Sequence, residues 1–193
     1  MPAMVAVSEH LFAQLGDAAD VRPTVLELGC GSGALLVELL KIGASAVTGV
    51  DLSAESLAAA GRRALEAGVG DRASFQVGDG AHVTVTAHDW VVLDRAICCY
   101  PDMPALVGNA IAAARSRVAF SVPTSRGVRG RANKIAWGLE SWLTRTPLQR
   151  GSCPGYVHEL DDIEGRLGAG GFKRRSSRTD WLWYTCVWER TSA

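Results

Sequence analysis

The sequence has no apolar run approaching the ~20 residues that a membrane-spanning helix needs. Its first residues also lack the basic segment followed by an apolar stretch that marks a secretory signal peptide. We therefore expect a cytoplasmic protein with no transmembrane segment. Alternating apolar strand and helix patterns continue without a linker, so we expect a single domain over residues 1–193.

Cysteine and histidine are too few and too scattered to indicate a disulfide framework or a metal site. The chain has five cysteines with no C-x-x-C pair, and its four histidines lie at positions 10, 82, 88 and 158. An odd number of cysteines fits a reducing compartment. We expect no metal, and we interpret the adjacent Cys98 and Cys99 as small packing residues, with a redox or ligand-contacting role as the alternative.

Three glycines at alternate positions interrupt an apolar run near the start of the chain. Residues 25–33 read VLELGCGSG, and the following ALLVELLKIG has apolar residues at helical spacing. The glycines thus lie where a strand turns into a helix, and glycine allows positive φ and a close approach to the backbone. Such a turn is expected to point unpaired N–H groups at a ligand, which makes a nucleotide-type cofactor the first hypothesis.

An acidic residue follows the second apolar strand at the distance expected for ribose recognition. The strand AVTGV at 46–50 ends in Asp51, twenty residues after Gly31. A carboxylate at this end of a parallel strand is placed to accept hydrogen bonds from ribose hydroxyls. Both a dinucleotide and S-adenosylmethionine carry such a ribose, so these residues indicate the adenosine end of a ligand and not the chemistry.

Three further features favour S-adenosylmethionine. Glu27 lies inside the first strand, where a buried carboxylate needs a cationic partner such as a methionyl ammonium. The segment ASFQVGDG ends a third strand with Asp79, where an acid can reach an adenine amino group. The final FKRRSSRTDWLWYTCVWER reads as an antiparallel hairpin, which is unusual in a dinucleotide fold. With E-x-G-x-G-x-G, Asp51 and GDG, residues 24–123 resemble the class I S-adenosylmethionine-dependent methyltransferases.

This resemblance implies methyl transfer from S-adenosylmethionine to a small-molecule acceptor. The glycine turn would wrap the methionine part, Asp51 would bind the ribose, and residues near Leu52 and Asp79 would contact the adenine. The implied cofactor residues are Glu27, Gly29, Cys30, Gly31, Gly33, Asp51, Leu52, Asp79, Gly80 and Asp94. The stretch DWVVLDRAICCYPDM resembles, more loosely, the magnesium-protoporphyrin O-methyltransferases.

Two other classes stay open at this point. GCGSGA also satisfies G-x-G-x-x-A, so an NAD(P)-binding oxidoreductase is one alternative. Only 23 residues precede the first core strand, a shorter stretch than many of these methyltransferases have. The alternatives that follow from it are an open site, a homo-oligomer that covers the site from a second subunit, or a non-catalytic binding or partner module.

The strand and helix patterns together predict an α/β fold. We expect a Rossmann-like, seven-stranded, mostly parallel sheet with helices on both faces and an antiparallel C-terminal hairpin. The last strand should lie antiparallel within the sheet. The predicted strands are 24–28, 46–50, 73–77, 89–94, 117–122, 172–179 and 181–189.

Opposite charges are divided between the two parts of the chain. Residues 1–114 carry 6 basic and 13 acidic residues, and residues 115–193 carry 14 and 7. A basic stretch at 126–150, after the fifth strand, is predicted to lie over the cofactor cleft. It is either an ordinary solvated helix, part of a substrate-side lid over 126–158 in which Arg129 and Arg131 pair with an anion, or a nucleic-acid or membrane surface. The near-neutral isoelectric point argues against nucleic acid.

Polar residues near the predicted strand ends are the candidates for contact with the acceptor. Asp94 is the first choice for a cleft-facing catalytic group near the methyl group, and Tyr100 is a second catalytic candidate. Arg95, which follows Asp94, is a candidate substrate contact. His158 can take a proton or hold a carboxylate, and Tyr156 lies beside it as a substrate contact. The alternatives are a capping or loop role for Asp94 and His158 and simple packing for Tyr156.

Overall fold

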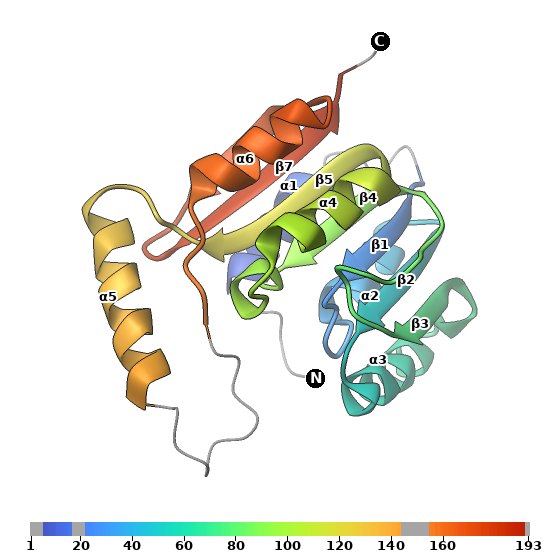
Figure 1. Cartoon of the computed structure of the whole chain (residues 1–193). Helices are drawn as coiled ribbons and strands as arrows, with labels where there is room; N and C mark the ends of the chain where they lie inside the picture. Colours follow the sequence, from blue (N-terminus) through green and yellow to red (C-terminus); the bar gives the residue numbers. More distant parts are fainter. Residues whose placement is uncertain (1–5, 17–21, 144–154, 192–193) are drawn as a thin grey trace.

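Seven strands form one sheet in the computed structural model, which describes residues 6–16, 22–143 and 155–191 (Figure 1). The spatial order is β3-β2-β1-β4-β5-β7-β6. The strands are β1 (Thr24–Leu28), β2 (Ala46–Asp51), β3 (Ala73–Val77), β4 (His88–Asp94), β5 (Ala114–Pro123), β6 (Phe172–Thr179) and β7 (Trp183–Arg190). Neighbours from β3 to β5 are parallel, whereas β7 is antiparallel to both β5 and β6. The predicted fold class and the antiparallel hairpin are confirmed.

The strand ends differ from the predicted ones where turns and neighbours decide them. β5 extends in both directions beyond 117–122, because it pairs with β4 on one side and β7 on the other. β7 begins at Trp183 and not at 181, because the Asp180 N–H donates to the Trp183 carbonyl at 2.8 Å and closes the hairpin turn.

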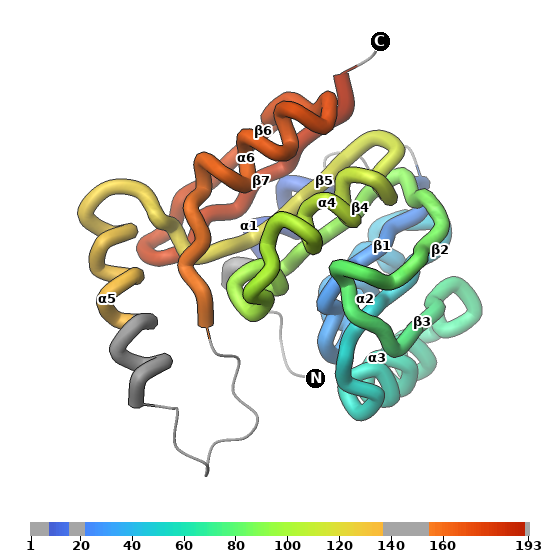
Figure 2. The backbone as a smooth tube through the Cα atoms, in the orientation of Figure 1, coloured from blue at the N-terminus to red at the C-terminus, as the bar shows by residue number. Residues whose placement is uncertain are grey.

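Helices cover both faces of the sheet (Figures 1 and 2). The helices are α1 (Ala6–Gly16), α2 (Ala34–Lys41), α3 (Ala54–Glu66), α4 (Met103–Ala113), α5 (Gly127–Leu143) and α6 (Leu160–Ala169), with short turns η2 (Gly70–Arg72) and η3 (Ile97–Cys99). In β1, Val25 packs with α1 and α2 while Leu26 packs with α4 and α6, as strand alternation requires. The sheet therefore separates two apolar cores.

Side-chain caps fix where the helices after β2 and β4 begin. The Ser53 hydroxyl accepts the Ser56 N–H at 3.1 Å, and the Asp102 carboxylate accepts the Ala105 N–H at 3.0 Å. Each helix is thus separated by a loop from the strand that precedes it. These loops leave Asp51 and residues 95–100 at the carboxyl edge of the sheet.

α5 projects away from the sheet after β5 (Figure 2). Its buried Asn133 donates to the carbonyls of Thr124 at 3.0 Å and Leu182 at 3.1 Å, so a polar residue holds the helix to the body. Val128 and Ile135 are 81% and 72% exposed. A helix is confirmed for this part of the basic stretch, but its described apolar residues face outward.

Residues 144–150 of the basic stretch lie outside the described residues. Among the helices that the structure describes, none is long and apolar enough to cross a membrane.

Candidate functional site

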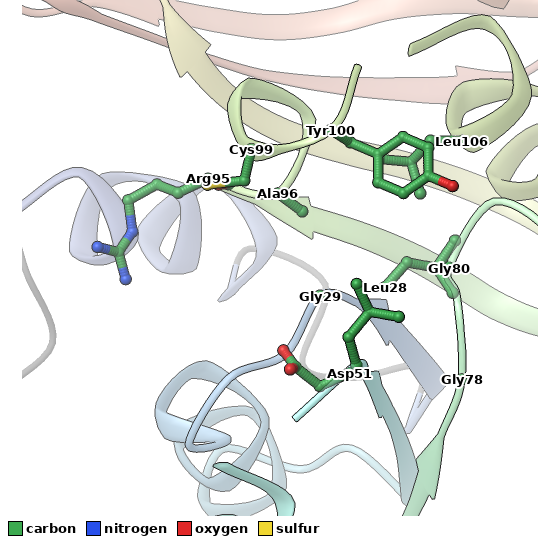
Figure 3. A pocket seen from close by; sticks show the side chains of 11 residues that line it. Leu28, Gly29, Asp51, Gly78, Gly80, Arg95, Ala96, Cys99, Tyr100 and Leu106 are labelled. Carbon is green, nitrogen blue, oxygen red and sulfur yellow. The ribbon is translucent and has the colours of Figure 1, made fainter. Parts of the chain in front are cut away.

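The carboxyl ends of β1, β2 and β4 meet around a pocket of about 230 Å³ (Figure 3). This is the edge at which open parallel sheets bind ligands. The lining residues come from the glycine turn, the ends of β2 and β3, the loop after β4, and α4. They are Leu28, Gly29, Asp51, Leu52, Gly78, Gly80, Arg95, Ala96, Cys99, Tyr100 and Leu106.

The glycine turn is shaped by close approaches that exclude side chains. Gly29 has φ +80°, and a Cβ there would lie 2.7 Å from the Ala96 Cβ. Gly31 has φ +51°, and a Cβ there would meet nothing within 4 Å. Positive φ therefore explains both glycines, and Gly29 is in addition required by the loop that follows β4.

The N–H groups of this turn correct the expectation that they are unpaired. Those of Gly29 and Cys30 donate to the Val50 carbonyl at 2.8 and 3.0 Å, and that of Gly31 donates to Asp51 Oδ2 at 2.8 Å. The Gly33 N–H donates to the Cys30 carbonyl at 2.9 Å. The turn is thus bonded to β2 and to itself, and these donors are not available to a phosphate.

Cys30 and Gly33, both implied as cofactor residues, are directed toward the core. The Cys30 side chain is buried, and a Cβ at Gly49 would lie 2.7 Å from its sulfur. A Cβ at Gly33 would lie 2.9 Å from the Ala60 Cβ, at the contact between α2 and α3. Neither residue lines the pocket, and both contribute to the packing that shapes the turn.

Asp51 is oriented by the backbone at the end of β2. Its Oδ2 accepts the Gly31 N–H, and its Oδ1 accepts the Ser53 N–H at 2.9 Å. A carboxylate keeps free lone pairs after accepting two hydrogen bonds, so this group can still accept hydroxyl donors from a ligand. Leu52 beside it is 68% exposed and lines the same pocket, as an apolar contact for a flat ring requires.

Glu27 is a buried carboxylate without a complete set of partners. It is 3% exposed, and its Oε2 has no hydrogen-bond partner within the described part of the chain. Burial raises its pKa well above the ordinary value, and the nearby Asp94 raises the pKa further, while Arg95 opposes the rise. Glu27 does not itself line the pocket, and its pairing with a cationic group of the cofactor stays a prediction.

Asp94 is held below the surface rather than presented in the pocket. It is 8% exposed and accepts hydrogen bonds from the Ser8 hydroxyl of α1 and, at 2.5 Å, from the Ser121 hydroxyl of β5. Arg95 Nε lies 3.6 Å from its Oδ2. The structure therefore does not place this carboxylate facing the cleft, as the sequence predicted. Instead, the hydroxyls of two serines donate hydrogen bonds to it.

Asp79 and Tyr100 are joined at the other end of the pocket. The Tyr100 hydroxyl donates to Asp79 Oδ2 at 2.7 Å, and His82 Nδ1 lies 3.1 Å from the same oxygen. The hydrogen bond from Tyr100 is the main reason that the pKa of Asp79 is lowered. Burial and the bond to Asp79 raise the pKa of Tyr100 to about 12.

Tyr156 and His158 lie together against the loop that carries Tyr100. Their rings stack with centroids 5.7 Å apart, and the Tyr156 N–H donates to the Cys98 carbonyl at 2.6 Å. His158 Nε2 lies 2.9 Å from the Tyr100 carbonyl. Because a carbonyl only accepts, Nε2 carries the hydrogen, and Nδ1 is the basic nitrogen of the neutral ring.

The three predicted arginines occupy different positions. Arg95 lines the pocket, has φ +54°, and points to the opposite end from Tyr100 (Figure 3). The Arg129 guanidinium lies 5.2 Å from the centroid of the Trp181 ring, and Arg131 is exposed. No residue of α5 over 127–136, the part whose side chains the structure describes, lines this pocket, so the structure joins Arg95, but not Arg129 or Arg131, to the cofactor site.

Several lining residues have no signal in the sequence. Ala96 and Leu106 contribute apolar walls from the loop after β4 and from α4. A Cβ at Gly80 would lie 3.1 Å from Leu106 Cδ1, so the glycine allows this wall to approach. Small and aliphatic residues of this kind look like ordinary core, and only the packing of α4 on the sheet brings them to the pocket.

Residues 25–119 match the family model described as "Methyltransferase domain". The ribosomal protein L11 methyltransferase of Actinobacillus succinogenes is 39% identical over 56 residues, which are 29% of this chain and 19% of that relative. The chain thus matches about a fifth of the length of this curated relative.

Solved structures resemble nearly the whole chain. Magnesium protoporphyrin IX methyltransferase from Synechocystis with bound S-adenosylhomocysteine has a TM-score of 0.76 at 22% identity, covering 95% of this chain and 82% of its own. An O-methyltransferase of neocarzinostatin biosynthesis, solved with S-adenosylhomocysteine and 1,4-dihydroxy-2-naphthoic acid, has a TM-score of 0.68 at 21% identity. It covers 95% of this chain and 56% of its own. The match to a methyltransferase domain thus includes the strands and the glycine turn that build the pocket, and the likeness of fold to solved methyltransferases continues through the C-terminal hairpin.

Proposed function

We propose that this protein transfers a methyl group from S-adenosylmethionine to a small-molecule acceptor. The observation that carries the proposal is the buried Glu27 carboxylate, whose Oε2 has no partner among the described residues, close to Asp51 and Arg95. An uncompensated carboxylate in this position suits a ligand that brings its own positive charge, as a methionyl ammonium does.

A dinucleotide fits the same turn less well. A pyrophosphate needs backbone N–H donors at the start of the helix. In the turn that precedes α2, the N–H groups of Gly29, Cys30 and Gly31 donate to β2 and that of Gly33 donates to the Cys30 carbonyl, so these four are not available to a pyrophosphate. A buried carboxylate near the turn would also repel a phosphate, so both features favour a cationic ligand.

The roles of the residues follow from their positions. When bound, S-adenosylmethionine supplies an electrophilic methyl group on its sulfonium. Asp51 would accept the ribose hydroxyls, Leu52 would pack on the adenine, and Ala96 and Leu106 would exclude water from the pocket. Positioning and exclusion of water can then provide much of the rate enhancement.

The acceptor that this arrangement suits best is anionic. Arg95 lines the pocket and is held at positive φ, a strained conformation for a non-glycine residue that the loop after β4 maintains. One similar methyltransferase was solved with a naphthoic acid, a small acid of the kind that an arginine binds. Within a single domain of 193 residues, we propose that 126–158 acts as the substrate-side lid, with Arg129, Arg131 and Tyr156 as acceptor contacts.

A general base is needed only if the accepting atom carries a proton that must leave. Asp94 and His158 stay candidates, although Asp94 already accepts from two serines and His158 donates to the Tyr100 carbonyl. Asp94 would therefore have to share an existing hydrogen bond, whereas His158 would accept the proton at Nδ1 and keep its bond to Tyr100.

Calorimetric titration of the purified protein with S-adenosylhomocysteine, and with NAD in parallel, tests the proposal. We expect micromolar binding of S-adenosylhomocysteine, no binding of NAD, and loss of binding in Asp51→Ala. The control is Asp71→Ala, which removes an exposed carboxylate from η2 outside the pocket.

Either of two results would overturn the cofactor assignment. Binding of NAD would favour the oxidoreductase alternative. Binding of neither ligand by a folded sample would favour a non-catalytic module. If S-adenosylhomocysteine binds, acids with a free hydroxyl are the first acceptors to screen for methyl transfer.

A further inference from the structure

Tyr100 lies at the end of the pocket where Gly78 and Gly80 flank Asp79 (Figure 3). It was predicted as a catalytic residue, but its hydroxyl is committed to Asp79 at 2.7 Å. This bond joins the loop after β4 to the loop after β3. It therefore acts on the acid that, under the proposed function, contacts the adenine.

The acceptor positions of Asp79 are nearly all used within the described residues. Oδ1 accepts the Ala81 N–H at 3.0 Å, and Oδ2 is shared by the Tyr100 hydroxyl and His82 Nδ1. A carboxylate offers about four lone-pair positions. The remaining lone pair is on Oδ1, so a ligand can add one hydrogen-bond donor there, whereas a ligand acceptor would find no donor on this carboxylate.

The loop that carries Tyr100 is fixed from outside the pocket. η3 closes on itself through the Tyr100 N–H to the Ile97 carbonyl at 3.2 Å. The segment before α6 then adds two bonds, from the Tyr156 N–H to Cys98 and from His158 Nε2 to the Tyr100 carbonyl. The Tyr156 and His158 rings also stack on each other, so the two residues that make these bonds support each other's position.

We propose that Tyr100 is a specificity-determining residue, which orients Asp79 to accept the exocyclic amine of the adenine, and that His158 is a positioning residue for Tyr100. The inference rests on the proposed function, because it assumes an adenosyl ligand in this pocket. It assigns Tyr100 to cofactor discrimination and not to proton transfer. It also connects the segment after α5 to the cofactor end of the site.

The test compares S-adenosylhomocysteine with S-inosylhomocysteine, in which an oxo group that only accepts replaces the amine. We expect the wild-type protein to prefer the adenosyl ligand by roughly tenfold, since the amine donates a hydrogen bond to the Asp79 carboxylate, whereas an oxo group places one acceptor against another. Tyr100→Phe keeps the ring and removes the hydroxyl. We expect the preference to fall to about twofold, mainly through weaker adenosyl binding.

Tyr184→Phe is the matched control. Tyr184 also donates its hydroxyl to a carboxylate, Glu164 at 2.5 Å, but it is on β7 and does not line the pocket. Its loss should lower thermal stability and leave the ligand preference unchanged. The preference is a ratio of two affinities, so partial unfolding of a variant does not alter it.

His158 is tested by the same ratio. We expect His158→Ala to reduce the preference, and His158→Gln, whose side-chain amide can donate to the Tyr100 carbonyl, to restore it. Equal weakening of both ligands by Tyr100→Phe, or a preference unchanged by it, would overturn the inference while leaving the proposed function intact. Failure of the wild-type protein to bind S-adenosylhomocysteine would overturn both.

Discussion

At the scale of the single residue, Glu27 is held where it opposes folding. Burial and the neighbouring Asp94 raise its pKa above the ordinary 4.5, so the folded state binds the proton more tightly than the unfolded state. Above pH 4.5 the unfolded chain releases this proton first, and the free energy of unfolding therefore decreases as the pH rises. Such a cost is expected where a residue serves a ligand rather than the fold.

Glu27→Gln should separate these two roles. We expect the variant to gain thermal stability relative to the wild type at pH 8, with a smaller gain at pH 5, because the raised pKa no longer opposes folding. Its affinity for S-adenosylhomocysteine should fall by roughly tenfold, since a charged partner is lost. Melting curves at the two pH values and calorimetric titration measure both quantities. Unchanged affinity would show that Glu27 has no ligand to pair with.

At the scale of the element, α1 is fastened to the sheet by polar bonds as well as by Leu11 and Leu15. Ser8 donates to the buried Asp94, and the Gln14 side-chain amide donates to the Thr185 hydroxyl at 3.0 Å. These bonds lie on the face of the sheet that also carries Glu27. α1 therefore closes the carboxyl edge of the sheet beside the cofactor pocket.

Ser8→Ala should loosen this helix. Removing a hydroxyl that donates to a buried carboxylate costs about 1–3 kcal/mol, because Asp94 loses a partner that water cannot replace at 8% exposure. Gln14→Ala, at the part-buried contact, should cost less, about 0.5–1.5 kcal/mol. Urea unfolding of both variants gives the comparison. A smaller loss for Ser8→Ala than for Gln14→Ala would contradict the account of Asp94.

α5 gives the element-scale test of the lid. Arg131 is exposed, and Arg129 rests on Trp181. If the lid holds an anionic acceptor, Arg129→Glu with Arg131→Glu should lower turnover of an identified acid by tenfold or more, as loss of charge-assisted bonds predicts. Binding of S-adenosylhomocysteine should be unchanged. Lys173→Glu with Arg178→Glu, two exposed positions of β6, is the control for the same change in net charge. Unchanged turnover in the α5 double variant would leave α5 as a solvated helix.

At the scale of the whole molecule, the acidic and the basic parts of the sequence supply different ends of the sheet. β1 to β4 belong to the acidic part of the chain, and β5 to β7 belong to the basic part. The sheet order keeps each group together, so acidic and basic residues gather toward opposite ends of the sheet. Arg95, at the end of β4, lies where these two parts meet.

A network around Glu164 connects the elements of the basic part. Glu164 on α6 accepts the Tyr184 hydroxyl of β7 and the Arg126 guanidinium, at 2.5 and 2.7 Å. Burial opposes ionisation, but these hydrogen bonds and Arg126 lower the pKa of Glu164. A lowered pKa contributes stability that is present above the ordinary value of 4.5 and is lost as the pH falls through the folded-state value.

Glu164→Gln should therefore destabilise the protein at pH 7 by about 1–3 kcal/mol, and by less near pH 3. Asp161→Asn is the matched control, because Asp161 also contacts Arg126 but its side chain is 84% exposed. Such an exposed pair contributes about 0–1 kcal/mol. Melting temperatures of both variants and the wild type between pH 3 and pH 7 measure these losses. A loss of stability in Glu164→Gln that does not change with pH would contradict the ionic role of Glu164.

The strands, the helices and the glycine turn could be predicted from the amino-acid sequence, because each depends on residues close together in the chain. The bounds of β1, β3 and β6 agree with the predicted 24–28, 73–77 and 172–179. Strand alternation, helical spacing and glycines at positive φ are local properties. The acid that orients the turn, Asp51, follows from the same local motif.

Which side chains contact each other could not be predicted from the sequence and depends on the folded arrangement. Asp94 is bound by Ser8, 86 positions away, and the Tyr100 carbonyl by His158, 58 positions away. The commitment of Tyr100 to Asp79 and the outward face of α5 were equally invisible in the sequence. The physical reason is that local periodicity records which face of an element is buried, whereas the partner of a polar group depends on the order of the strands and the packing of distant helices.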